Sequence, residues 1–437
     1  MKQILKAFND QIYIPEVIKL LGEHYFKQRY IDTYDYSLMK YKCGSGKLSV
    51  GMKDILVRWE CVISITGELI FNISTDDTFG FYLQTLRDER GELSGRTDDN
   101  EWIITAKEIF FTRISSKSDK PSTTIACLVE YFNCKKEIRE LNSKRVLAYI
   151  SNFDFVGVEF TESERKFIKD KFTVKLHGRE FVFQQLEHRK LILEIVKSKK
   201  IDRAIFSKIN FSILNDETKE EVDRYLELVS WFLSLVGVKA TMIPLVEYYN
   251  DRDELIEIEF RDLISSPFHS NIVIDNLQCR RGLVQYFNEC YDNFVKLYTD
   301  HSLNVFVASI VGMYEGKFLE HKIAGLILSY EFLLTKYLVN LGNDLESIKR
   351  LSIQDKLRTL NKYMKFIPAR LLTDTIRQDV RNALFHTGEI PALTDDEKYE
   401  LYKDYYDLLI QIILRILGYR GNYITPKDYS SVSLYRE

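Results

Sequence analysis

Apolar and polar residues alternate along much of the chain between about residues 47 and 134. Side chains alternate between the two faces of a strand, so this pattern predicts β-structure. The runs at 55–65 and 69–73 are separated by Thr66-Gly67 and predict a hairpin. Further runs at 102–105 and 123–132 extend the pattern, and we expect a β-rich amino-terminal domain, residues 1–145, with a sandwich-like sheet.

The next region, residues 146–275, mixes the two periodicities. Two short β-like runs flank His177-Gly178-Arg179 and predict a second hairpin, at residues 172–176 and 180–183. A helix that ends at Gly237 is predicted from apolar positions every three or four residues, at Val222, Leu226, Val229 and Leu233. Residues 255–260 alternate as a half-buried strand. The pattern leaves open whether this mixed α/β region is a domain of its own or forms one sensor unit with residues 1–145.

From about residue 276 the helical period runs almost unbroken to the end of the chain. It predicts helices at residues 282–297, 303–314, 322–341, 352–364, 373–387 and 395–417. Helices in such close succession favour an all-α bundle, which we assign to a third domain, residues 276–437. The expected fold class is therefore α+β and multidomain, with a β-rich amino-terminal region followed by a helical bundle.

Composition narrows the classes of function. The 437 residues include 61 basic and 64 acidic ones, for a formal net charge of -3. This balance argues against a chain that coats nucleic acid non-specifically, so any such site must be local. No apolar run approaches the roughly 20 residues of a membrane helix, and the first residues lack the features of a signal peptide. We therefore expect a cytoplasmic protein with no membrane partner.

Cysteine and histidine spacing predicts no metal centre. The six cysteines include no CxxC pair, and the seven histidines form no HExxH motif. Reduced thiols are the expected state of the cysteines, and we expect neither a metal site nor a cofactor.

The predicted helix at residues 373–387 carries the side chains best suited to chemistry. Thr373 or Asp374 can cap its start, and Gly388 suits a left-handed end. At about 100° per residue, one stripe of this helix faces the core of the bundle; its members are Ile376, Val380, Ala383 and Leu384. The opposite face is then polar.

That polar face brings a cation, an amide and an imidazole together at Arg381, Asn382 and His386. Arg381 and His386 lie about 140° apart around the axis of a regular helix, so both can reach one ligand above Asn382. Arginine binds phosphate oxygens with a planar fork of donors, and histidine moves protons near neutral pH. If the nucleophile is the 2′-hydroxyl of RNA, no metal is needed. Arg377 is a secondary candidate for the phosphate site, and Phe385, also outward, is a candidate interface residue.

The string Arg381-Asn382-x-x-x-His386, on the penultimate helix of a carboxy-terminal bundle, resembles the RNxxxH signature of the HEPN superfamily. Glu331 is similar to an acidic residue common on an earlier helix of that domain, and Lys356-Leu357-Arg358-Thr359-Leu360 is similar to its KxxxL stretch. The resemblance covers about residues 320–420. A long β-rich region before such a bundle looks most like the Apea-type HEPN proteins of prokaryotic antiphage defence.

The resemblance implies a metal-independent endoribonuclease that acts in abortive infection. In that reading Arg381, Asn382 and His386 are catalytic, Glu331 is a secondary site residue, and two copies of the motif meet in a homodimer. The amino-terminal region would sense a phage-derived trigger or hold the nuclease inactive. The alternative is a non-catalytic HEPN interaction module that serves dimerisation, a toxin partner or nucleotide-binding regulation. The sequence does not specify the RNA target or the activating signal.

Overall fold

The computed structural model describes residues 39–435, apart from 64–66, 77–88, 117–121, 138–142, 156–157, 162–165, 188, 200–202, 215–216, 263–267, 270–271, 275–278, 280–281 and 374–379. Two compact units emerge. The first contains residues 1–153, 179–226 and 242–268, and the second contains residues 154–178, 227–241 and 269–437.

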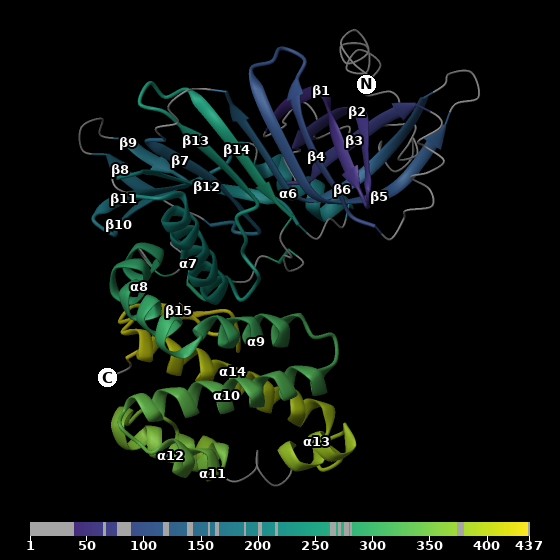
Figure 1. Cartoon of the computed structure of the whole chain (residues 1–437). Helices are drawn as coiled ribbons and strands as arrows, with labels where there is room; N and C mark the ends of the chain where they lie inside the picture. Colours follow the sequence, from purple (N-terminus) through teal and green to yellow (C-terminus); the bar gives the residue numbers. More distant parts are fainter. Residues whose placement is uncertain are drawn as a thin grey trace. The chain divides into compact units, whose positions relative to one another are not determined.

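A closed six-stranded barrel lies in the first unit (Figure 1). Its strands are β1 Met39–Val50, β2 Lys53–Ile63, β3 Leu69–Asp76, β4 Gly91–Thr97, β5 Trp102–Ser116 and β6 Ser122–Lys136. They follow the order β6-β3-β2-β1-β4-β5, and an antiparallel β5–β6 pairing closes the ring. The expected sandwich is therefore wrong. Alternation marks the inward face of a sheet in a sandwich and in a barrel alike, so the pattern did not distinguish the two architectures. The hairpin expected at 55–73 is confirmed as β2 and β3, with Ile63 opposite Leu69.

Glycines allow the neighbouring barrel strands β1 and β4 to approach closely. A Cβ atom on Gly44 would lie 1.9 Å from the carbonyl oxygen of Arg96, and one on Gly95 would lie 2.5 Å from that of Ser45. Inside the barrel the side chains form one apolar cluster that includes Leu48, Val57, Trp59, Ile73, Ile104 and Phe132. The barrel interior is a packed core.

The sheet continues beyond the barrel because β6 also pairs with β14 Leu255–Arg261. From β14 the order runs through β13 Leu245–Tyr249, β7 Arg145–Ser151 and β12 Ile205–Ser212 to β11 Arg179–Gln185. Helix α6 Arg189–Lys199 buries Ile192 and Val196 against Phe206 of β12. The half-buried strand expected at 255–260 is confirmed as β14.

The predicted second hairpin is present as two strands joined by a tight turn. Strand β10 Lys171–Leu176 and β11 flank His177 and Gly178, whose φ angles are 49° and 77°. Positive φ at both central residues matches the right-handed twist of paired strands. Helix α7 Lys219–Gly237 is also confirmed, with all four predicted apolar positions buried.

Helices dominate the second unit. They are α8 Gly282–His301, α9 Leu303–Glu315, α10 Leu319–Asn340, α11 Leu345–Arg350, α12 Ile353–Met364, a 3-10 turn Ala369–Leu372, α13 Asn382–Thr387 and α14 Asp395–Leu417. Figure 1 shows α9, α10 and α14 lying alongside one another. The helices expected at 282–297, 303–314, 322–341, 352–364 and 395–417 are present as α8, α9, α10, α12 and α14. Of the helix expected at 373–387, the structure describes a helical conformation for residues 380–387. Helix α11 was not predicted. A capping box of Thr394 and Glu397 sets the start of α14.

Strands also occur in this unit, so the expectation that they stop near residue 276 is wrong. After that residue, β15 Asn422–Ile424 pairs with β16 Ser431–Ser433. Earlier in the same unit, β8 Val158–Thr161 pairs with β9 Lys166–Lys169. Strands of three residues are too short to show a period of two. Beneath β15, Asp407 of α14 accepts hydrogen bonds from the hydroxyls of Tyr423 and Thr425, at 2.9 and 2.8 Å.

Candidate functional site

The residues of the Arg381–His386 motif lie on the last helical segment before α14. Val380 and Arg381 form a π-helical turn, and α13 carries the rest of the motif. The sequence predicted a regular α-helix from Thr373, and the π turn corrects that prediction. π-Helical turns occur often at functional sites. Ile376 and the candidate Arg377 lie outside the described residues. Thr373 itself is extended, with φ -74° and ψ 163°.

Burial divides this segment as the sequence predicted. Val380 and Leu384 are buried, at 0% and 8% exposure, and Ala383 is half-buried. Arg381, Asn382 and His386 are exposed. The helix ends at Gly388, whose φ of 79° is left-handed and whose N–H donates to the carbonyl of Leu384 at 2.9 Å. The apolar stripe therefore anchors the segment, and its polar residues face outward.

Phe385 shares the exposed side with the motif. Phe385 is 50% exposed, and the Arg381 guanidinium lies 5.8 Å from the centroid of its ring. At this distance the ring attracts the cation electrostatically, and the contact restricts where the guanidinium points. An exposed aromatic ring next to an arginine is also the composition found at the centres of protein interfaces.

Glu331 of α10 faces the motif from behind Arg381. Its Oε1 lies 3.7 Å from Arg381 Nε, and its Oε2 accepts a hydrogen bond from the Lys356 ammonium of α12. Because Glu331 approaches the Nε edge, the two Nη groups of Arg381 are left for another anion. One carboxylate between two cations leaves the cluster with a net positive charge.

Lys356 belongs to the KxxxL stretch identified in the sequence, but the sequence predicted no role for it. Its side chain is only 3% exposed, and it lies on the side of α12 that buries Ile353, Leu357 and Leu360. A buried ammonium needs a partner, because removing it from water is costly. The feature of the sequence that indicates a buried, paired lysine is a charged residue beside the apolar stripe of a helix. Glu331 is therefore held by a buried cation on one side and offers its other oxygen to Arg381.

The cluster can bind an anion and move a proton beside it. Arg381 supplies charge and planar donors, Asn382 an amide, and His386 an imidazole that gives or takes a proton. Across the part of the chain that the structure describes, no group of three or more His, Cys, Asp or Glu side chains could hold a metal ion. Among the same residues, no helix is long and apolar enough to cross a membrane.

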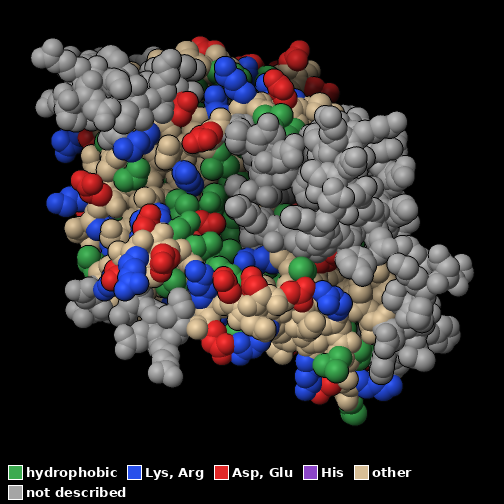
Figure 2. Space-filling view, turned by 90° about the horizontal axis from the view of Figure 1, so that it is seen from above, with side chains coloured by type: hydrophobic (Ala, Val, Ile, Leu, Met, Phe, Trp, Pro, Cys, Tyr) green, Lys and Arg blue, Asp and Glu red, His purple; other side chains and the backbone are tan. Residues whose placement is uncertain are grey.

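Charge on the outer surface is mixed. Figure 2 shows lysine, arginine, aspartate and glutamate side chains interspersed over the described part of the face seen from above. On that face no broad basic surface is visible. An exposed cation such as Arg381 is therefore the kind of local anion site that the charge balance left open.

Comparison with known proteins gives no relative from which a role can be transferred. The chain matches no family model, no curated protein and no solved structure.

Proposed function

We propose that this protein is an endoribonuclease of the HEPN type that needs no metal ion for the chemical step. The observation that carries the proposal is the exposed set Arg381, Asn382 and His386 on one short helical segment, with the Glu331 carboxylate 3.7 Å from Nε of Arg381. The phosphodiester of RNA brings its own nucleophile, the 2′-hydroxyl. The protein then has to supply a proton acceptor, a proton donor and charge for the phosphate.

In the proposed step, His386 takes the proton of the 2′-hydroxyl while O2′ attacks phosphorus. The O2′–P bond forms and the P–O5′ bond breaks, and the leaving O5′ receives a proton from an imidazolium. A second copy of the motif, carried by a second chain, supplies that imidazolium. The products are a 2′,3′-cyclic phosphate and a 5′-hydroxyl end. The Nη groups of Arg381 bind the non-bridging oxygens as their negative charge grows.

The homodimer is part of the proposal, because one motif carries one imidazole and the step needs an acid and a base. The exposed ring of Phe385 beside Arg381 supports a contact between two copies at this helix. We propose further that the reaction serves antiphage defence by abortive infection. The β-rich unit would respond to a phage-derived trigger or keep the nuclease inactive until then.

The test is incubation of purified protein with total RNA, tRNA and mRNA in EDTA, followed by analysis of the new ends. The wild type should leave 2′,3′-cyclic phosphates and 5′-hydroxyls. His386→Ala should lower the cleavage rate by a factor of at least 100, within the range that general acid–base catalysis supplies. His301→Ala, which alters a histidine at the end of α8, is the matched control and should cut normally. Full activity in His386→Ala would refute the assignment.

A second candidate function rests on Phe385. An exposed aromatic ring on a docking helix also suits a non-catalytic module that dimerises or binds a partner protein. Under that alternative, the wild type cuts no RNA, and Arg381→Ala and His386→Ala leave its cellular effect unchanged. The same cleavage assay therefore separates the two functions.

A further inference from the structure

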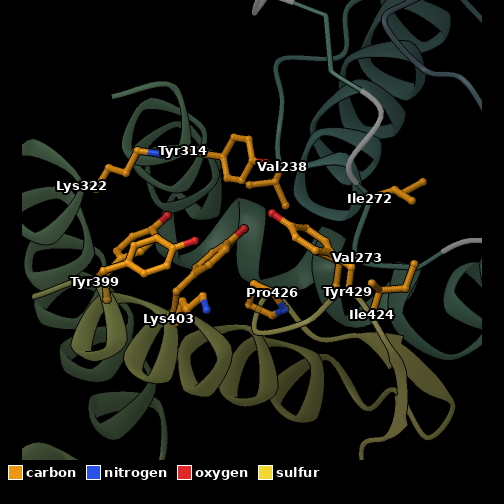
Figure 3. Close-up of a pocket in the computed structure, with 12 residues that line it drawn as sticks. Val238, Ile272, Val273, Tyr314, Lys322, Tyr399, Lys403, Ile424, Pro426 and Tyr429 are labelled. Atoms are coloured by element: carbon orange, nitrogen blue, oxygen red, sulfur yellow. The ribbon is translucent and has the colours of Figure 1, made fainter. Parts of the chain in front are cut away.

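A small pocket lined by tyrosines lies in the helical unit, apart from the motif residues. Its volume is about 110 Å³, and it falls between the end of α9, the first turns of α10 and α14, and the segment around β15. Figure 3 shows Tyr314 and Lys322 on one side and the α14 residues Tyr399 and Lys403 on another, with Tyr429 across from them. A cavity of about 150 Å³ holds benzene, so a molecule of about five or six non-hydrogen atoms fits this pocket.

Two stacked tyrosines form the inner wall of the pocket. The rings of Tyr402 and Tyr406 lie 5.6 Å apart with 15° between their planes, and both residues are buried. Tyr402 is only 6% exposed, and its hydroxyl has no hydrogen-bond partner among the described residues. Burial raises the pKa of Tyr402, so this hydroxyl keeps its proton and can donate it. A buried hydroxyl is almost always hydrogen-bonded in native proteins, so we expect an acceptor atom from outside the chain there.

Lys322 lies beside this wall and forms no ion pair within the described residues. Its Nζ lies 5.4 Å from the ring centroid of Tyr314 and 5.7 Å from that of Tyr402. Lys403, another lysine of the pocket, already pairs with Glu400 at 3.4 Å. Burial lowers the pKa of Lys322, which reflects the cost of an uncompensated charge. A single negative charge from outside the chain would therefore remove that cost.

Apart from its tyrosines and lysines, the lining of the pocket is apolar. Its other members are Val238, Ile272, Val273, Ile424 and Pro426. An apolar lining favours an apolar body in the ligand, since a polar group would lose its bonds to water here without replacing them. A carboxylate has two acceptor oxygens and one negative charge, which match one hydroxyl donor and one ammonium. The ligand that fits therefore combines one carboxylate with a short apolar chain.

We propose that this pocket binds a short-chain monocarboxylic acid of about the size of propionate or butyrate. One carboxylate oxygen accepts the hydroxyl of Tyr402, the other lies at the ammonium of Lys322, and the hydrocarbon chain packs on the apolar lining. Inorganic phosphate has no apolar part and fits this lining less well. The inference does not depend on RNA cleavage, because the pocket shares no residue with the Arg381–His386 motif. The helical unit is then a receptor for a small acid as well as the carrier of the motif.

Titration of the full chain, followed by saturation-transfer NMR of the ligand, tests the proposal. The ligands are propionate and butyrate, with propionamide and inorganic phosphate as separate arms. Propionamide has the shape of propionate without its charge, so both acids should bind at least about tenfold more tightly than it does, and more tightly than phosphate. Lys322→Met should weaken butyrate binding about tenfold, and Tyr402→Phe, which removes one oxygen, about fivefold. Lys336→Met is the matched control on the exposed side of α10 and should change nothing.

Three results would overturn the inference. They are no binding of either acid at tens of millimolar, equal affinity for propionamide or for phosphate, and unchanged binding in both Lys322→Met and Tyr402→Phe. The comparison of propionate with propionamide uses the wild type, so it stands even if a variant fails to fold. His386→Ala should bind butyrate with wild-type affinity, so a failure here is distinguishable from a failure of the proposed nuclease.

Discussion

Removing the charge of Glu331 should destabilise the helical unit far more than removing that of Lys356, although the two form one ion pair. The reason is unequal burial: the Lys356 side chain is 3% exposed and that of Glu331 is 29% exposed. Glu331→Gln leaves a buried ammonium without a counter-charge, which costs about 3 kcal/mol of unfolding free energy. Lys356→Met leaves a carboxylate that still contacts water and Arg381, so its cost should be about 1 kcal/mol.

Urea unfolding followed by circular dichroism at 222 nm measures this difference, because most of the described helices belong to this unit. With a urea slope of about 1–3 kcal/mol per molar, Glu331→Gln should lower the midpoint by about 1–3 M. The double variant Glu331→Gln with Lys356→Met should be more stable than Glu331→Gln alone, since no buried charge remains. Glu346→Gln, in an exposed pair with Lys349, is the control and should shift the midpoint little. Equal losses in the two single variants would refute the reasoning.

Three further predictions concern a helix start, a buried lysine and the proposed interface. Thr394→Ala removes the hydroxyl that accepts the N–H of Glu397, and should lower the unfolding free energy by about 1 kcal/mol in a urea melt. Burial lowers the pKa of Lys239 to about 8, so wild-type stability should rise as pH increases from about 8 towards the ordinary lysine value of about 10.4. Lys239→Met should lose that rise, and a wild-type minus variant difference that stays constant over this range would contradict it. Phe385→Asp should weaken the dimer at least about 30-fold in sedimentation equilibrium, and an unchanged dimer would place the interface elsewhere.

The parts of the fold that follow from local pattern were predictable from the sequence. The hairpin of β2 and β3 and the long helix α14 each show their period within one continuous stretch. Barrel closure depends instead on which strands become neighbours. Ile104 of β5 pairs opposite Cys134 of β6 to close the ring, and alternation says which side chains point inward without saying which strand lies beside them.

The candidate site divides in the same way. Spacing along one helix located Arg381, Asn382 and His386, and the exposure of these residues agrees with their predicted outward face. The π turn at Val380 could not be predicted, because one extra residue in a single turn hardly changes the spacing of the apolar positions. The contact of Glu331 with Lys356 joins two helices, and the pocket at Tyr402 joins several elements. Neither has a signal within a single segment.

Strand β6 has a consequence for the order in which the chain is made. Along one edge its first half pairs with β3 and its second half, Tyr131–Lys135, pairs with β14. The side chain of Asn133 donates a hydrogen bond to that of Glu257 in β14, which lies 124 positions later in the chain. A ribosome adds about 5–20 residues per second. The edge of β6 at Tyr131–Lys135 therefore stays without its β14 partner for several seconds after the barrel strands have emerged. An unpaired strand edge is a template for other chains, so we expect the nascent protein to need a chaperone most during that interval.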